Sequence, residues 1–206
     1  MKALLLGSDS HSVGIAAAIV KRGGIVAYPT DTVYGLGCDP FSPVALERLV
    51  EAKEREAKPI PVLCASEGDA RRLVDLGQRA LALAKVHWPG ALTIVAPLRL
   101  RVPDLLNQGT DWLGVRVPDD ATALALAGAC GGYITGTSAN LSGRPSSGSA
   151  GEVADSLGDR IDAILDAGPR RGTESTVVRV RGDNVEVLRR GAVAFDPGIR
   201  PERLDR

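Results

Sequence analysis

Short apolar runs alternate with amphipathic stretches along most of this chain, and this alternation is the feature that most limits its fold. The apolar runs predict strands at residues 2–6, 25–28, 60–64, 91–95, 113–117, 133–135, 161–165, 175–180 and 184–188. The stretches between them predict helices that begin near Ser10 or Ser12 and near residues 43, 67, 120 and 150, with a break near Gly77. Strands that alternate with helices are typical of α/β proteins. We therefore predict a twisted, open mixed sheet flanked by helices, with a hairpin near its end.

The charge balance excludes a protein that binds nucleic acid by bulk attraction. The 206 residues include 25 Lys+Arg and 25 Asp+Glu, so the formal net charge is zero, whereas such proteins normally carry a basic surplus. Only 3% of the residues are aromatic, which leaves few side chains to stack on bases. Any site for an anion must therefore be local.

The other composition signals point to a cytoplasmic location. Three cysteines without paired spacing, together with two histidines, form no convincing zinc set. Reduced thiols are the simplest interpretation. No segment approaches the ~20 apolar residues that a membrane span needs. We expect one domain over residues 1–206, without a membrane segment.

Polar loops follow several of the predicted strands, and in open α/β sheets ligands bind beyond the ends of strands. Five loops contain hydroxyls, amides, glycines or cations, at residues 28–37, 53–58, 114–118, 135–146, and 174–178 with 188–191. None of them contains an obvious nucleophile, and the P-loop, dinucleotide, nucleophile-elbow and zinc-protease motifs do not occur. Neutral donors with cations suit the binding and transfer of phosphate groups.

Each loop also has a plainer explanation. The loop at residues 28–37 is equally explained as a glycine turn whose hydroxyls bond its own backbone. The cations at residues 53–58 alternate with Glu54 and Glu56, which is typical of a solvated helix surface. Arg116 lies in an apolar strand, so it requires an acid, a ligand or water as a partner.

Taken in order, these segments resemble the YrdC family, and specifically its L-threonylcarbamoyladenylate synthases. The matching motifs are Pro-Thr-Asp-Thr-Val-Tyr-Gly-Leu-Gly (29–37), Lys-x-Arg (53–55), Trp-Pro-Gly-Ala-Leu-Thr (88–93), Val-Arg-Val-Pro (115–118), Thr-Ser-Ala-Asn-Leu-Ser-Gly (137–143), Ser-Thr-Val-Val (175–178) and Leu-Arg-x-Gly (188–191). The resemblance covers nearly the whole chain. It looks like the short, single-domain form of the family.

The resemblance implies a YrdC-like fold with a concave, locally positive cavity and a nucleotidyltransferase activity. The implied reaction makes threonylcarbamoyl-AMP and pyrophosphate from L-threonine, bicarbonate and ATP with Mg²⁺, for the threonylcarbamoyl-adenosine modification of tRNA. A downstream threonylcarbamoyl transferase complex would take the product. The residues carried over for ATP are Lys53, Arg55, Ser138, Asn140, Ser146 and Arg189, of which Lys53 and Arg55 are also the catalytic pair. The residues carried over for threonine are Thr32, Arg116 and Ser175. The ligands of the metal are not identified.

Two positions depart from the family's pattern. Cys64 stands where many relatives have a histidine, and Arg190 where proline is usual. Paralogues of uncertain activity tend to lack the Lys-x-Arg and Ser-x-Asn pairs, and this chain has both. The alternative function is an RNA-binding YrdC-like module without synthase activity. A local basic patch of Lys53, Lys58, Arg144 and Arg189 could then contact tRNA weakly.

Overall fold

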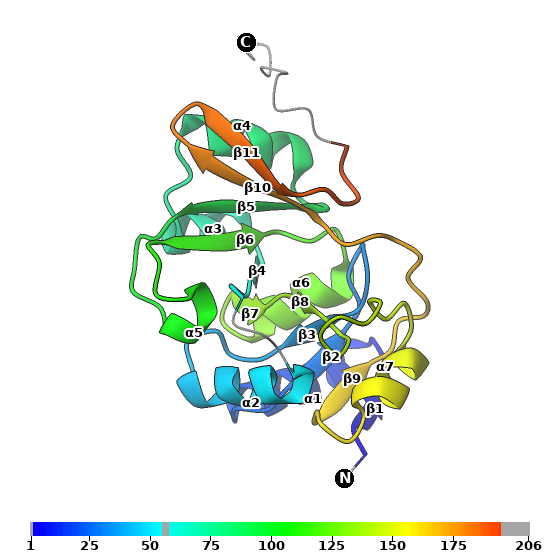
Figure 1. Ribbon diagram of the computed structural model, residues 1–206. Coiled ribbons are helices and arrows are strands. Elements are labelled where there is room, and N and C mark those ends of the chain that lie inside the picture. The colour runs from blue at the N-terminus through cyan, green and yellow to red at the C-terminus, as the bar shows by residue number, and fades with distance from the viewer. Residues whose placement is uncertain (1, 55–57, 195–206) are drawn as a thin grey trace.

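The computed structural model describes residues 2–54 and 58–194. Within these residues, helices and strands alternate as the sequence predicts, and the α/β class is confirmed (Figure 1). The helices are α1 (Ser10–Lys21), α2 (Pro43–Lys53), α3 (Glu67–Leu73), α4 (Gln78–His87), α5 (Asp104–Asn107), α6 (Ala121–Ala129) and α7 (Ala150–Leu157). The strands are β1 (Leu4–Leu6), β2 (Val26–Tyr28), β3 (Gly35–Gly37), β4 (Val62–Cys64), β5 (Leu92–Pro97), β6 (Trp112–Arg116), β7 (Tyr133–Thr135), β8 (Thr137–Ser138), β9 (Ala163–Leu165), β10 (Thr176–Arg181) and β11 (Asn184–Arg189).

The strands form two mixed sheets, whereas the sequence led us to expect one. The five-stranded sheet has the order β1-β9-β2-β3-β8, and the six-stranded sheet has the order β11-β10-β5-β6-β4-β7. One of the crossings between them lies at Gly136, since β7 pairs with β4 while β8 pairs with β3. A Cβ atom at Gly136 would lie 2.7 Å from the side chain of Leu63, so this tight crossing requires glycine. The strands β3 and β8 occur in segments that the sequence analysis assigned to loops, because hydroxyl residues and glycines dominate them.

Five of the described helices, α1, α2, α3, α6 and α7, begin after a residue whose side chain caps the first turn. Asp9, rather than Ser10 or Ser12, caps α1, because its carboxylate accepts hydrogen bonds from the backbone amides of His11 and Ser12 at 3.0 and 3.1 Å. Ser42 caps α2. The expected break near Gly77 is confirmed, since Gly77 separates α3 from α4. No helix in the described part of the chain is long and apolar enough to cross a membrane.

One face of the six-stranded sheet is available to build a site. Successive residues of a strand point to opposite faces. In β6, Leu113 and Val115 therefore pack in the core, while Trp112, Gly114 and Arg116 share the other face. Figure 1 shows β5, β6, β10 and β11 in the upper part of the view and the strands β2, β3 and β9 in the lower part.

Candidate functional site

A cavity of about 830 Å³ is lined by residues of both sheets and of the loops between them. Seven of the nine predicted site residues line it, namely Thr32, Lys53, Arg116, Ser138, Asn140, Ser175 and Arg189. Ser146 lines a smaller adjoining cavity of about 220 Å³. Arg55 lies outside the described residues.

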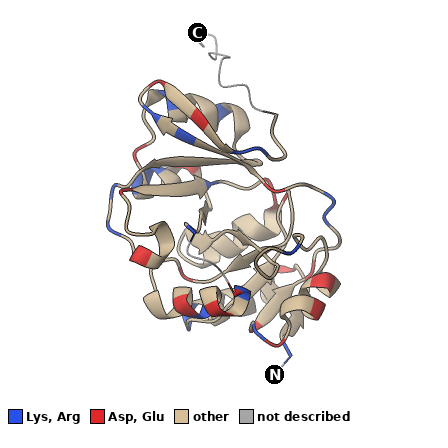
Figure 2. Cartoon of the chain, in the orientation of Figure 1, with Lys and Arg blue, Asp and Glu red and all other residues tan. Residues whose placement is uncertain are grey.

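The cavity is locally positive although the chain is neutral. Its described lining includes six cationic residues and one acidic residue; the cations are Lys53, Lys58, Arg116, Arg144, Arg179 and Arg189, and the acid is Glu174. Many of the other acids lie on helices, as Figure 2 shows for α2 and α7. The positive charge of the lining is therefore local, as the zero net charge requires of any anion site in this chain.

Lys53 connects α2 to the loop that carries Ser138 and Asn140. It is the last residue of α2, and only 2% of it is exposed. Its ammonium group donates to the backbone carbonyls of Ser138 and Asn140, the second at 2.7 Å, while the amide of Ser142 donates to the carbonyl of Lys53 at 2.9 Å. Lys53 is therefore a buried anchor of this loop, and not part of a solvated helix surface.

Arg116 and Thr32 meet at one end of the cavity. Arg116 is only 4% exposed, and its Nε donates to the carbonyl of Gly90 at 2.8 Å. Its two terminal nitrogens donate to the hydroxyl of Thr32 at 3.3 Å and to the carboxylate of Asp31 at 2.5 Å. The partner that the sequence left open is therefore an acid, Asp31. The motif at residues 29–37 contains Asp31, but sequence reasoning assigned it no role.

The hydroxyl of Thr32 is oriented by Thr30. The two hydroxyl oxygens lie 2.9 Å apart, and Thr30 donates its own proton to the carbonyl of Val33 at 2.7 Å. Thr32 must then donate to Thr30. Because Thr32 also accepts from Arg116, one lone pair remains for a ligand. The cavity therefore presents Thr32 as a hydrogen-bond acceptor.

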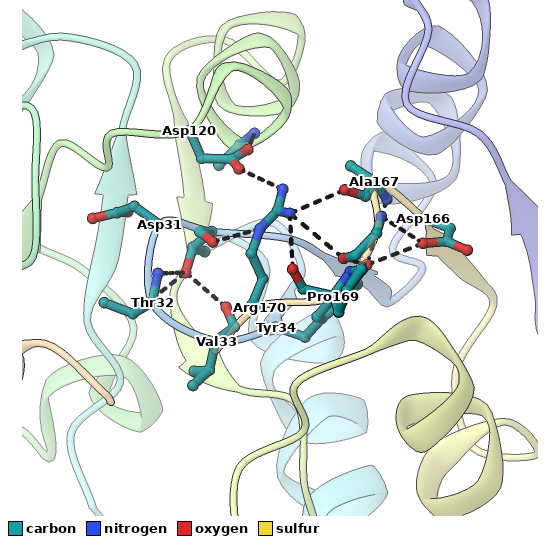
Figure 3. A network of polar contacts seen from close by, with 12 residues as sticks. Asp31, Thr32, Val33, Tyr34, Asp120, Asp166, Ala167, Pro169 and Arg170 are labelled. Carbon is teal, nitrogen blue, oxygen red and sulfur yellow. Dashed lines mark hydrogen bonds and ion pairs between the residues drawn. The ribbon is translucent and has the colours of Figure 1, made fainter. Parts of the chain in front are cut away.

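Arg170 fixes the backbone next to Thr32 and is the centre of the network of polar contacts in Figure 3. Its guanidinium group donates to the carbonyl of Thr30 at 2.9 Å, to the carbonyl of Ala167 at 3.0 Å and to the carboxylate of Asp120 at 2.9 Å. Asp120 also caps α6, as the sequence predicts. The backbone amide of Gly172 donates to the carbonyl of Thr32 at 3.2 Å. Sequence reasoning missed Arg170, because its loop carries no motif.

Ser175 and Arg189 lie together, as the predicted hairpin requires. Arg189 donates to the carbonyl of Ser175 at 2.9 Å and to its hydroxyl at 3.2 Å. The hydroxyl of Ser175 lies 2.8 Å from that of Thr93 on β5. These contacts form a continuous row of polar groups, the polar floor, which runs from Arg189 on β11 through Ser175, just before β10, to Thr93 on β5. Thr93 ends the motif Trp-Pro-Gly-Ala-Leu-Thr at residues 88–93, but sequence reasoning assigned it no role.

Glu174 is the main site residue that sequence reasoning missed. One carboxylate oxygen accepts from the hydroxyl of Ser146 at 2.6 Å, and the other forms an ion pair with Arg189. Burial by itself would raise the pKa of Glu174, but the hydrogen bond from Ser146 and the charge of Arg189, with smaller contributions from Ser138 and Lys53, lower the pKa below its usual value. The feature of the sequence that could have identified Glu174 is its position next to Ser175 and across the predicted hairpin from Arg189.

Cys64 does not offer a nucleophile. It is fully buried at the end of β4 in the main hydrophobic core, and burial raises the pKa of its thiol. The thiolate is the reactive form of cysteine. Cys64 is therefore a packing residue.

The residues of the cavity suit a metal ion that binds together with a phosphate ligand better than a metal ion that the protein holds by itself. Among the described residues, no group of three or more His, Cys, Asp or Glu side chains is placed to hold a metal. Mg²⁺ commonly uses one or two carboxylates together with substrate phosphates. Glu174 supplies one carboxylate.

Comparison with known proteins agrees with these observations. A curated threonylcarbamoyl-AMP synthase from Pyrococcus abyssi is 38% identical over 191 residues, which cover 91% of this chain and 56% of that protein. This chain thus spans little more than half the length of that relative. The crystal structure of P. abyssi Sua5 complexed with L-threonine matches with a TM-score of 0.87 at 36% identity, over 93% of this chain and 58% of that one.

The same architecture occurs in Escherichia coli YciO, whose crystal structure matches with a TM-score of 0.86 at 26% identity, over 96% of this chain and 99% of that one. A family model named Sua5/YciO/YrdC, with the description "Telomere recombination", matches residues 18–191. On this sequence match, with the cavity and its motifs, the chain belongs to the Sua5/YciO/YrdC family.

Proposed function

We propose that this protein is a threonylcarbamoyl-AMP synthase, a nucleotidyltransferase that consumes L-threonine, bicarbonate and ATP. One observation carries the proposal: residues predicted for threonine and residues predicted for ATP line a single cavity, although they come from both sheets. The named relative and the threonine-bound Sua5 structure support it.

The threonine site would lie at the Arg116 end of the cavity. Three of the five N–H groups of Arg116 have protein partners, which leaves one on each terminal nitrogen for the substrate carboxylate. The free lone pair of Thr32 would accept a hydrogen bond from the threonine side chain or amine. Ser175 would contribute a second hydroxyl. A site built to bond a hydroxyl discriminates against amino acids that lack one.

The ATP site would lie around the Arg189 end of the polar floor. Its other residues would be Ser138, Asn140 and Ser146. Lys53 would act there mainly by holding the Ser138 to Asn140 backbone and by contributing its charge. Arg55 remains a prediction. Mg²⁺ bound with ATP would offset part of the triphosphate charge.

The reaction needs no protein nucleophile. The amine of threonine, after losing a proton, adds to carbon dioxide derived from bicarbonate and forms a carbamate. A carbamate oxygen then attacks the α-phosphorus of ATP, the bond to the β-phosphate oxygen breaks, and pyrophosphate leaves. Such transfers depend on alignment of the reactants and on neutralising charge. Aligned donors and cations are what the described lining supplies.

The test is to incubate the purified protein with ATP, Mg²⁺, bicarbonate and labelled threonine and to separate the products. We expect threonylcarbamoyl-AMP and pyrophosphate in equal amounts, with no product when bicarbonate or threonine is omitted. Valine should not replace threonine, because it lacks the hydroxyl. Failure to form the adenylate under these conditions would refute the proposal.

The proposal also extends to the cellular setting. The product would be passed to a threonylcarbamoyl transferase complex that modifies tRNA, and the enzyme would act in the cytoplasm. A weak tRNA contact remains compatible with the cations near the cavity. An RNA-binding module alone is less well supported, because Lys53 of the predicted basic patch is buried and bonded to backbone carbonyls. A steep salt dependence of RNA binding without threonine-dependent ATP turnover would favour that alternative.

A further inference from the structure

The carboxylate of Glu174 occupies a position among the groups that are predicted to hold the phosphates of ATP. Its two oxygens contact Ser146 and Arg189, both of which belong to the predicted ATP set. Glu174 lies two residues before β10 and lines the cavity, and 34% of its side chain is exposed. A bound triphosphate that engages Ser146 and Arg189 would therefore approach an existing anion.

The surroundings favour the charged form of this carboxyl group. The hydrogen bond from Ser146 and the charges of Arg189 and Lys53 lower the pKa of Glu174, although burial by itself would raise it. Glu174 is therefore ionised at neutral pH. Metal-free nucleotide should bind poorly here, since repulsion between like charges about 5 Å apart in a partly buried site weakens binding by roughly tenfold or more.

We propose that Glu174 is the protein ligand for the divalent cation that accompanies the nucleotide, and that it makes nucleotide binding dependent on that cation. The inference rests on the proposed function. Mg²⁺ is suited to this position because it binds one or two carboxylates together with phosphate oxygens and water. A cation between Glu174 and the phosphates converts a repulsive pair of anions into an attractive arrangement. Ser146 and Arg189 orient the carboxylate for this purpose.

The experiment measures equilibrium binding of adenylyl imidodiphosphate, an ATP analogue, by titration calorimetry in Mg²⁺ and in EDTA. The wild-type protein is compared with Glu174→Gln, which keeps the size of the side chain and removes its charge. The matched control is Glu67→Gln. Glu67 lies on α3 and pairs with Arg71 at 3.7 Å.

We expect Mg²⁺ to strengthen wild-type binding by about tenfold or more, and Glu67→Gln to keep this ratio. In Glu174→Gln the ratio should fall below about threefold, with tighter binding in EDTA than the wild type shows, because the repulsion is gone. An unchanged ratio in Glu174→Gln overturns the inference. If that variant binds more tightly in EDTA but keeps the full ratio, Glu174 is only a repelling anion, and the metal role is overturned.

Two wild-type results are decisive without any variant. Equal affinities in Mg²⁺ and EDTA overturn the inference but leave the proposed function in place. Failure to bind the analogue in either condition contradicts the proposed function and the inference together. Thermal melting of Glu174→Gln checks that it is folded. If it is not, Glu174→Asp takes its place, because it keeps the charge and withdraws the carboxylate by one methylene; the ratio should again fall, and an unchanged ratio overturns the inference.

Discussion

Replacing Lys53 should reduce the stability of the protein as well as its activity, because the side chain is buried and its ammonium group holds backbone carbonyls. The relevant contacts are those to the carbonyls of Ser138 and Asn140, and only 2% of Lys53 is exposed. Two substitutions separate the charge from the aliphatic stem. Lys53→Met keeps most of the stem, while Lys53→Ala removes both.

The expected magnitudes follow from these contacts. An unsatisfied buried polar group costs about 1–3 kcal/mol. The carbonyl of Asn140 loses the ammonium donor, while the carbonyl of Ser138 keeps the backbone amide of Asn140 at 3.1 Å. Removing the buried charge also removes its desolvation cost, and this offsets part of the loss in the free energy of unfolding. We therefore expect Lys53→Met to lower the free energy of unfolding by about 2 kcal/mol. Lys53→Ala should lower it by about 4 kcal/mol, because it also leaves a cavity.

Urea denaturation followed by circular dichroism measures both changes in the free energy of unfolding. In a thermal melt, each kcal/mol lost should lower Tm by roughly 2–4 °C for a chain of this size. The matched control is Lys85→Met, at an exposed lysine of α4, which should change stability by less than about 0.5 kcal/mol. Both Lys53 variants should also lose pyrophosphate release, since the Ser138 loop is displaced. Stability within about 1 kcal/mol of wild type for Lys53→Ala would refute the anchoring role.

Three further predictions test other parts of the structure. Gly172→Ala places a Cβ atom 2.7 Å from the carbonyl oxygen of Thr32, so it should raise the KM for threonine more than that for ATP in a pyrophosphate-release assay; equal changes in both would count against the positioning of Thr32 by this segment. Burial raises the pKa of Cys130 to about 11 and also raises that of Cys64, so both thiols should be protonated at pH 8 and react slowly with a thiol reagent. The labelling rate of the partly exposed Cys130 should rise as the pH approaches 11, whereas fast labelling of Cys64 in the native protein would contradict its burial. Asp120→Ala removes a helix cap and a partly buried ion pair, so urea denaturation should show a loss of about 2 kcal/mol, and a loss below about 0.5 kcal/mol would show that neither contact matters.

The sequence predicted the site residues better than it predicted their partners. The pairing of Ser175 with Arg189 followed from a hairpin, which is a local structure with a readable turn. The contact of Arg116 with Asp31 joins residues 85 positions apart, and no pattern in the sequence specified it. Lys53 looked like a surface cation because Glu54 and Glu56 follow it in the chain, yet the loop at residues 138–142 covers it.

The sequence by itself determined the α/β class, the loops that line the cavity and the condition that any anion site in a neutral chain must be local. Periodicity, turn residues and charge are local properties, so they can be read along the chain. Only the tertiary structure decided that the strands divide into two sheets, with one crossing of the chain at Gly136, and that Glu174 lies among the predicted phosphate ligands. Both outcomes depend on contacts between distant segments. Ser146 and Glu174, 28 positions apart, meet only after both segments have closed around the cavity.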